Sequence, residues 1–352
     1  MRVMVFLVAV AGIIWIGAGK AQDSSPWVMP RTPEGYPDLE GNWTNATITP
    51  IERSQEYGAI LTPEQVLDIE GRRQEFINVS SAPSDPDREA PPAGGVSTGG
   101  DAVLDAAAGG TGGYNIFYLD RGDRVAIYNG ELRSSLVTRP ENGRVPQLTP
   151  EGEQRRRALF LRRAQFGEYD NPENRPVAER CILSFGSNAG PPMLPNYFYN
   201  NNYTIVQTSG HIMIMTEMVH DVRIIQLGEP KAMPNDIRPW LGESWGRWVG
   251  DTLIVETTNL NLEQLNAYRW FLGASENLKV TERFTRASDH TINYSFTVED
   301  PDTYTSLWGG ELPFQAMEGD LLYEYACHEG NYALSNVLSG ARAEERQTTN
   351  DR

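Results

Sequence analysis

The chain has 352 residues, with 30 Lys or Arg against 47 Asp or Glu, which gives a formal net charge of −17 at pH 7. This acidic balance argues against binding to nucleic acid or to an anionic membrane surface, because both need basic patches. With 8 Trp, 15 Tyr and 11 Phe, the chain has ample material for a core, and intrinsic disorder of the whole is excluded.

The N-terminus has the pattern of a cleaved secretory signal. Arg2 precedes an apolar run over residues 3–19, and residues 19–21 form a small-x-small cleavage site. We therefore predict a signal peptide over residues 1–21, with an uncleaved N-terminal anchor as the alternative. Because no second apolar run of spanning length follows, we expect no stable membrane insertion after cleavage.

Residues 22–140 are predicted to supply strands, one helix and a long loop. The stretch GNWTNATITPIER is rich in strand formers. The helix after it begins at Thr62, where Pro63 takes the first helical position and Gln65 completes a capping box. Between Ser80 and Gly113 the chain is poor in hydrophobic residues and dense in Gly, Pro and Ala, which predicts a flexible loop.

Two or three strands are expected after this loop, with a turn at Asn129-Gly130. Residues 141–200 are predicted to form a connection of helix and loops. Its helix, LTPEGEQRRRALFLRRAQF, begins at Thr149-Pro150. The arginines of this helix could form a partner surface, although a solvated face fits them better. They are Arg155, Arg156, Arg157, Arg162 and Arg163.

From residue 201 onward the pattern changes to closely spaced strands, of which the last, LLYEYACHE, covers residues 321–329. Because no long helices separate these strands, we expect an antiparallel meander, closed as a barrel or stacked as a sandwich. The Gly-x-Trp patterns in EGNW and GRWVGDTLIVE favour a lipocalin-like barrel. The predicted fold class is mainly β: an antiparallel lipocalin-like meander barrel over residues 201–340, with a few covering helices, long loops and a disordered tail at 341–352.

Several long stretches resemble an uncharacterised family of exported bacterial proteins. They include IRPWLGESWGRWVGDTLIVETTN, ENLKVTERFTR, YSFTVEDPDTYT and YEYACHEGNYAL, and the resemblance runs from about Tyr114 to Glu345. It implies a place in the bacterial cell envelope and a lipocalin-like (calycin-like) barrel, and it assigns no catalytic residue. Together with the signal pattern, it predicts a periplasmic or secreted protein.

Cys181 and Cys327 are the two cysteines of the chain. In an oxidising compartment two cysteines most simply pair, so we predict a disulfide between them. The alternative is a nucleophilic Cys327 beside His328. Adjacent residues of a strand point to opposite faces, which makes such a dyad a poor fit.

Three carboxylates are expected to point into the barrel, because side chains alternate along a strand. Glu217, Glu282 and Glu324 each share a face with apolar residues in the predicted strands. An apolar environment raises a carboxyl pKa, which suits a general acid or base near neutral pH. His220 and His328 are candidate proton shuttles, and Arg223 could hold an anionic group.

Other interpretations compete with this one. A buried glutamate is often simply paired with an arginine, such as Arg223 or Arg247. His220-Asp221 and His328-Glu329 could ligate a metal, but they lack tight ligand spacing, and we predict no metal or cofactor. The GESWG stretch matches the serine-hydrolase motif around Ser244, yet a strand rather than a helix follows it.

Aromatic residues concentrate near the expected strand ends of the C-terminal half, where they could either bind a ring-bearing ligand or seal the barrel end. The predicted function is therefore action on a hydrophobic or ring-bearing small molecule inside the barrel. The first hypothesis is a cofactor-free acid–base enzyme, an isomerase, lyase or hydrolase. The second is a non-catalytic periplasmic protein that binds a small molecule or lipid. No oligomeric state is predicted.

Overall fold

The computed structural model describes residues 27–83, 87, 119–186, 190–196, 198, 200–231, 233–234, 237–317, 319 and 321–350. The predicted signal peptide over residues 1–21 lies outside these residues, and so does most of the Gly-rich loop predicted between Ser80 and Gly113.

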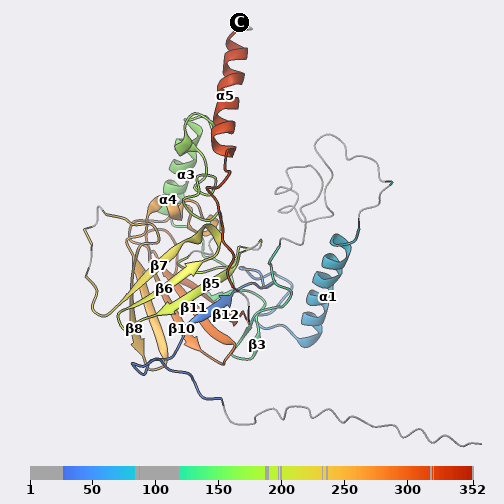
Figure 1. The fold of residues 1–352 in the computed structure, drawn as a ribbon, viewed down its shortest axis with the longest axis vertical. Helices are drawn as coiled ribbons and strands as arrows, with labels where there is room; N and C mark the ends of the chain where they lie inside the picture. The colour runs from blue at the N-terminus through green and yellow to red at the C-terminus, as the bar shows by residue number, and fades with distance from the viewer. Residues whose placement is uncertain are drawn as a thin grey trace, which may run out of the picture.

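A closed barrel of nine strands dominates the described part of the chain (Figure 1). Strands β5 to β12 follow one another in sheet order, and β1 closes the barrel by pairing with both β5 and β12. This confirms a mainly β protein with a closed barrel. The barrel strands are β1 (Gly41–Thr44), β5 (Asn202–Gln207), β6 (His211–Thr216), β7 (Val222–Leu227), β8 (Glu243–Val249), β9 (Thr252–Thr258), β10 (Lys279–Arg286), β11 (Thr291–Glu299) and β12 (Trp308–Ala316).

One strand pair departs from the expected antiparallel meander, because β7 and β8 pair in parallel. The connection between them spans residues 228–242, which is long enough to bring the chain back to the same end of the sheet. Figure 1 shows this connection as a long loop beside the barrel.

Short strands flank the barrel. β4 (Val137–Arg139) pairs with β12, and β2 (Ile127–Tyr128) forms a hairpin with β3 (Glu131–Leu132). The hairpin turns at Asn129-Gly130 as predicted, and both turn residues have positive φ, of 51° and 80°. Such a turn favours Asn-Gly because each residue tolerates the left-handed region.

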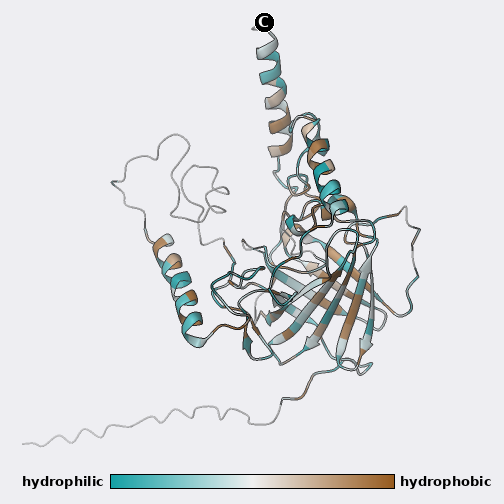
Figure 2. Cartoon of the chain, turned by 180° about the vertical axis from the view of Figure 1, so that it is seen from behind, coloured by the Kyte–Doolittle hydropathy of each residue, from teal (hydrophilic) through white to brown (hydrophobic). Residues whose placement is uncertain are grey.

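The helices of the described residues lie outside the barrel (Figure 1), and the start of α1 confirms the sequence prediction. The Thr62 hydroxyl accepts from the Gln65 amide at 3.3 Å, and the Gln65 side chain accepts from the Thr62 amide at 2.9 Å. Figure 2 shows α1 as mostly hydrophilic, and none of its residues is buried. The helices are α1 (Pro63–Ser80), α3 (Pro150–Ala164), α4 (Leu262–Leu265) and α5 (Ala333–Asn350).

The prediction of the last strand is wrong. The sequence pattern predicts a strand at residues 321–329, whereas the structure has β12 at Trp308–Ala316. Residues 321–332 form a segment without helix or strand, here called the strap. Helix α5 follows the strap and includes residues 341–350, where a disordered tail was predicted.

The barrel interior is packed with aromatic side chains. The rings of Tyr203 and Phe314 stack with centroids 5.2 Å apart, and Phe284 contacts Tyr294 at 4.9 Å. At one end Trp308 packs against other buried rings of the C-terminal half, which fits the sealing role for those aromatics. Within the described residues, no helix is both long and apolar enough to cross a bilayer.

Candidate functional site

Arg223 and Glu282 form an ion pair inside the barrel. Arg223 Nη1 lies 2.8 Å from Glu282 Oε2 and Nη2 lies 2.9 Å from Oε1, with side chains only 2% and 0% exposed. The inward position predicted for Glu282 is therefore correct. The arrangement matches the structural alternative, in which a buried glutamate is paired with Arg223.

Tyr294 completes this buried network. Its hydroxyl donates to Glu282 Oε1 at 2.8 Å and accepts from the Met193 amide at 2.9 Å. Burial, reinforced by the charge of Glu282, raises the pKa of Tyr294 well above its usual value, so the phenol stays protonated and keeps donating. Both carboxylate oxygens of Glu282 are thus engaged within a packed core.

Glu217 is buried, but for a different reason from the one predicted. The inward side chains of β6 include Ile212 and Ile214, whereas Glu217 lies beyond the end of the strand. Its Oε2 accepts from Asn202 Nδ2 at 2.8 Å, and its Oε1 accepts from the amide of Tyr323 at 2.9 Å. Glu217 therefore fastens the strap to the barrel.

Asp120 lies near Glu217 and was missed from the sequence. Burial, together with the charge of Glu217, raises the pKa of Asp120. The residue is held there because its amide donates to the Phe198 carbonyl at 2.7 Å and its carbonyl accepts from Asn201 Nδ2 at 2.8 Å. These contacts join segments far apart in sequence, so no local pattern could have indicated them.

The remaining candidates do not join this region. Glu324 and His328 are exposed on the strap. His220 ends a short 3₁₀ turn, η3 (Met218–His220), and its side chain is not described. Of the six candidates, the described side chains thus bring only Arg223 and Glu282 into contact.

The structure also locates the residues of the other interpretations: the two cysteines, the serine-hydrolase motif and the possible metal ligands. Cys181 and Cys327 form the predicted disulfide, with Cα atoms 5.7 Å apart, and such a bond is typical of an oxidising compartment. Ser244 lies buried in β8 and bonds to Thr257 Oγ1 at 2.8 Å, which is not the exposed elbow a nucleophile needs. Among the residues that the structure describes, no group of three or more His, Cys, Asp or Glu side chains is arranged to hold a metal.

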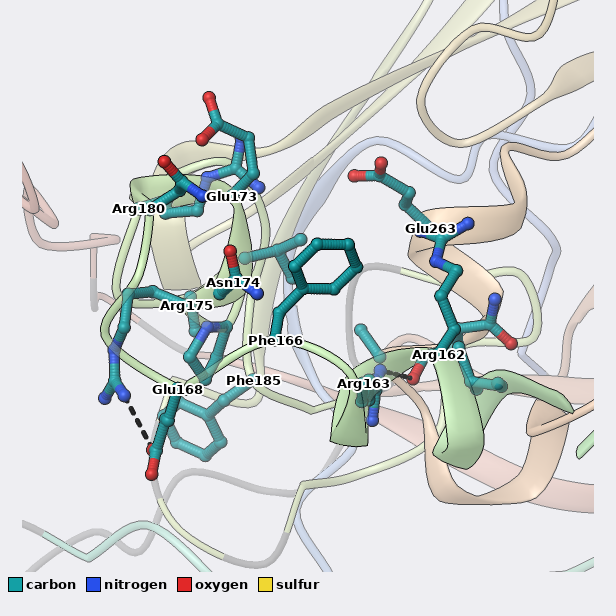
Figure 3. A pocket seen from close by; sticks show the side chains of 17 residues that line it. Arg162, Arg163, Phe166, Glu168, Glu173, Asn174, Arg175, Arg180, Phe185 and Glu263 are labelled. Atoms are coloured by element: carbon teal, nitrogen blue, oxygen red, sulfur yellow. Dashed lines mark hydrogen bonds and ion pairs between the residues drawn. The ribbon is translucent and has the colours of Figure 1, made fainter. Parts of the chain in front are cut away.

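A pocket of about 670 Å³ lies outside the barrel, between the C-terminal half of α3, the α4 region and the loop at 168–180 (Figure 3). We call it the arginine pocket. Four arginines and three glutamates line it, in a chain with a large excess of acidic residues. Its lining includes Leu159, Arg162, Arg163, Phe166, Glu168, Glu173, Arg175, Arg180, Phe185 and Glu263.

Arg175 organises the loop wall of the arginine pocket. Its side chain is 8% exposed and makes two 2.8 Å bonds to the carboxylate of Glu179 and one of 2.6 Å to Glu168. Its guanidinium also lies over the ring of Tyr169, 4.9 Å from the centroid. Because its charge is already balanced, Arg175 shapes the wall rather than offering a free charge.

Helix α3 forms the opposite wall and is held firmly to the barrel. Arg155 donates to the Gly273 carbonyl at 3.0 Å and to Thr303 Oγ1 at 2.7 Å. Gly152 lets the helix come close, because a Cβ there would lie 2.7 Å from the Thr303 carbonyl oxygen. Arg163 links α3 to the α4 region through a 3.2 Å bond to the Asn266 carbonyl.

Arg162 and Arg180 differ from the other arginines of the pocket. Within the described part of the chain, neither guanidinium makes an ion pair or a hydrogen bond. Apolar surface accompanies them, since Phe166 and Phe185 line the same pocket and are 50% and 41% exposed. In Figure 3, Phe166 lies in the middle of the lining, between Arg162 and the Arg175–Glu168 pair.

A partial signal for this pocket is present in the sequence. Arg162 and Arg163 belong to the arginine cluster of the predicted helix, which could form a partner surface although a solvated face fits it better. The loop wall at 168–180 carried no recognisable pattern, because its fold depends on Arg175 and its two glutamates. Comparison of the chain with family models, with curated proteins and with solved structures finds no match.

Proposed function

We propose that the protein binds a small organic anion with an apolar or ring-bearing part in the arginine pocket, without catalysing a reaction. The observation that carries this proposal is the pair of guanidinium groups, on Arg162 and Arg180, beside the exposed rings of Phe166 and Phe185. A carboxylate would satisfy the charge, and the rings would cover an apolar body.

The chemistry and size of the pocket suit this ligand class. Planar guanidinium groups bind carboxylates with two parallel hydrogen bonds. Aromatic rings pack against apolar or ring-bearing groups, and ligand pockets are commonly about 300–1,000 Å³. The pocket volume of about 670 Å³ falls within this range.

Binding is favoured over acid–base catalysis by the positions of the predicted catalytic residues. Glu282 and Arg223 satisfy each other in the packed core, Glu217 holds the strap, and Glu324 and His328 are exposed on that strap. General acid–base catalysis needs its groups within hydrogen-bonding reach of one substrate. Because the predicted catalytic residues lie apart from one another, their positions favour a binding protein over an acid–base enzyme.

The proposed location is the bacterial periplasm or the exterior of the cell. The signal pattern, the resemblance to exported bacterial proteins and the disulfide between Cys181 and Cys327 support it. We further propose that the barrel belongs to the lipocalin-like class, with its ligand held outside the barrel rather than in the packed interior.

Isothermal titration with 1-naphthoate tests the proposal, with neutral 1-naphthalenemethanol as the uncharged comparison. We expect one site for the acid and much weaker binding of the alcohol. The double variant Arg162→Gln, Arg180→Gln should weaken 1-naphthoate binding by roughly 10- to 100-fold, the effect of losing charge-assisted hydrogen bonds. Arg157→Gln is the matched control, because Arg157 is exposed on α3 but does not line the pocket.

Either of two results would contradict the proposal. The first is binding of the alcohol as tight as that of the acid. The second is unchanged affinity for 1-naphthoate in the double variant, provided that its circular dichroism and melting match the wild type.

A further inference from the structure

The charged side chains of the arginine pocket come close to balancing one another. Four arginines and three glutamates line it, and Glu179 adds a fourth carboxylate, because it binds Arg175 from outside the lining. Arg175 is balanced within its own cluster, by Glu168 and Glu179. Two further carboxylates, on Glu173 and Glu263, remain in the lining, although a site for a simple anion has no use for them.

Glu173 and Glu263 resemble Arg162 and Arg180 in having no partner of their own. Across the ranges that the structure describes, neither carboxylate makes a hydrogen bond or an ion pair. Glu263 is exposed in α4, and Glu173 is exposed in a 3₁₀ turn, η2 (Pro172–Asn174). The pocket therefore offers two acceptor groups to a ligand as well as two donor groups.

The wall formed by α3 and α4 carries one of these groups of each sign. Arg162 lies in the last turn of α3, and Glu263 lies in α4. The 3.2 Å bond from Arg163 to the Asn266 carbonyl joins the two helices. The Ala267 amide donates to the Glu263 carbonyl at 3.1 Å, which fixes the backbone of Glu263 in that wall.

The loop wall carries the same combination of charges. Glu173 is exposed there, whereas Arg180 is half-buried. In Figure 3, Arg162 and Glu263 lie on one side of Phe166, and Glu173 and Arg180 lie on the other. A ligand that packs on the Phe166 ring therefore has a guanidinium and a carboxylate on either side of it.

We propose that the carboxylate bound in the arginine pocket belongs to a ring-bearing α-amino acid, which also carries an ammonium group. This inference rests on the proposed function and adds the ammonium as a second recognised group. A guanidinium binds the carboxylate, and a glutamate accepts hydrogen bonds from the ammonium. The Phe166 ring covers the apolar side chain of the ligand, and its face attracts the ammonium. An amino acid thus uses both signs of charge, whereas a simple anion is repelled by the glutamates.

Isothermal titration with three ligands that share a naphthalene ring tests this inference. They are L-3-(1-naphthyl)alanine, 3-(1-naphthyl)propanoate, which lacks the ammonium, and 2-(1-naphthyl)ethylamine, which lacks the carboxylate. We expect the amino acid to bind about tenfold more tightly than either of the others, the effect of one further charge-assisted hydrogen bond. The double variant Glu173→Gln, Glu263→Gln should abolish its advantage over the propanoate, which should keep or gain affinity. Glu151→Gln is the matched control, because Glu151 is exposed on α3 and does not line the pocket.

Failure of this inference would be distinct from failure of the proposed function. Binding of the propanoate as tight as that of the amino acid would overturn the inference and leave the proposed function standing. An unchanged advantage of the amino acid in the double glutamate variant would also overturn it, once circular dichroism shows that the variant is folded. Equal losses for both acids in that variant would mean that the glutamates are structural and would count against it too. Binding of neither acid, or of the amine as tightly as the amino acid, would contradict the proposed function and the inference with it.

Discussion

At the scale of single residues, the ion pair between Arg223 and Glu282 inside the barrel has a structural role. Arg223 and Glu282 are almost fully enclosed, and Tyr294 satisfies a carboxylate oxygen of the pair. Removing one partner of a buried ion pair leaves an uncompensated charge, whereas removing both charges together is often tolerated.

Glu282→Gln should therefore lower the free energy of unfolding by about 3–5 kcal/mol. The double variant Arg223→Met, Glu282→Gln should recover much of this loss, because no buried charge remains and the amide at position 282 can still accept from Tyr294. Urea unfolding followed by tryptophan fluorescence gives both values. A Glu282→Gln protein as stable as the wild type would refute the structural role.

Replacing Asp120 should raise stability, whereas replacing Glu282 should lower it. Its pKa is raised above the ordinary value of 3.8 by burial and by Glu217, so above its folded-state pKa the ionised carboxylate costs stability. Below 3.8 the group is protonated in both states and the cost disappears.

Asp120→Asn should thus melt at a higher temperature than the wild type at pH 7, and the difference should vanish as the pH falls below about 4. Melting curves across this range measure the effect, with Asp123→Asn as a nearby exposed control. A stabilisation that persists unchanged at low pH would mean that charge is not its cause.

Residue positions could be predicted from sequence where a strand has neighbours on both sides. Glu282 lies in the middle of β10, which pairs with β9 and β11, so alternation places it correctly inside. Glu217, Glu324 and His328 lie beyond strand ends, where alternation has no meaning. Asp120 and the Arg175 cluster depend on contacts between distant segments, which single-sequence patterns do not encode.

At the scale of elements, the sequence predicted a helix cap and a hairpin turn correctly, and it missed strand β12. Close packing around β12 explains why that strand was missed. The Thr62 cap and the Asn129-Gly130 turn appear where expected. β12 was missed because Gly309, Gly310 and Pro313 weaken its strand signal. The two glycines are needed there, since a Cβ on either would collide with the carbonyl oxygen of Phe296 or of Leu136.

The strap and the loop wall of the arginine pocket form one linked unit. The disulfide joins Cys327 of the strap to Cys181 at the end of the wall, and Asn331 donates to the Cys181 sulfur at 3.3 Å. Farther along, Arg342 of α5 donates to the carbonyls of residues 169 and 170 at 3.1 Å. The C-terminal segment thus holds the wall at two places.

Replacing both cysteines by serine should lower stability by about 2–5 kcal/mol, the usual cost of losing a native disulfide. Hydrogen exchange should rise in the strap and in the loop at 168–180, because their covalent link is gone. The strands β9 to β11 should keep their protection and serve as the internal control. Faster exchange across the whole barrel, with no preference for these two segments, would contradict a local role.

At the scale of the whole molecule, an acidic chain carries an arginine-lined pocket outside a barrel that is itself packed. The sequence predicted the closed barrel and the disulfide, and the structure shows both. It also predicted a ring-bearing or hydrophobic ligand inside the barrel, whereas we propose a ligand site outside it. A sequence pattern shows which residues face inward, whereas it does not show whether their rings fill the space. The packed rings of Tyr203, Phe284, Tyr294 and Phe314 fill it here.

A crystal structure of the protein with bound 1-naphthoate would test the proposed binding site in the arginine pocket most sharply. We predict that its carboxylate lies within hydrogen-bonding distance of Arg162 or Arg180 and that its ring system contacts Phe166. A ligand found inside the barrel or elsewhere on the protein, with the arginine pocket empty, would contradict the proposed function.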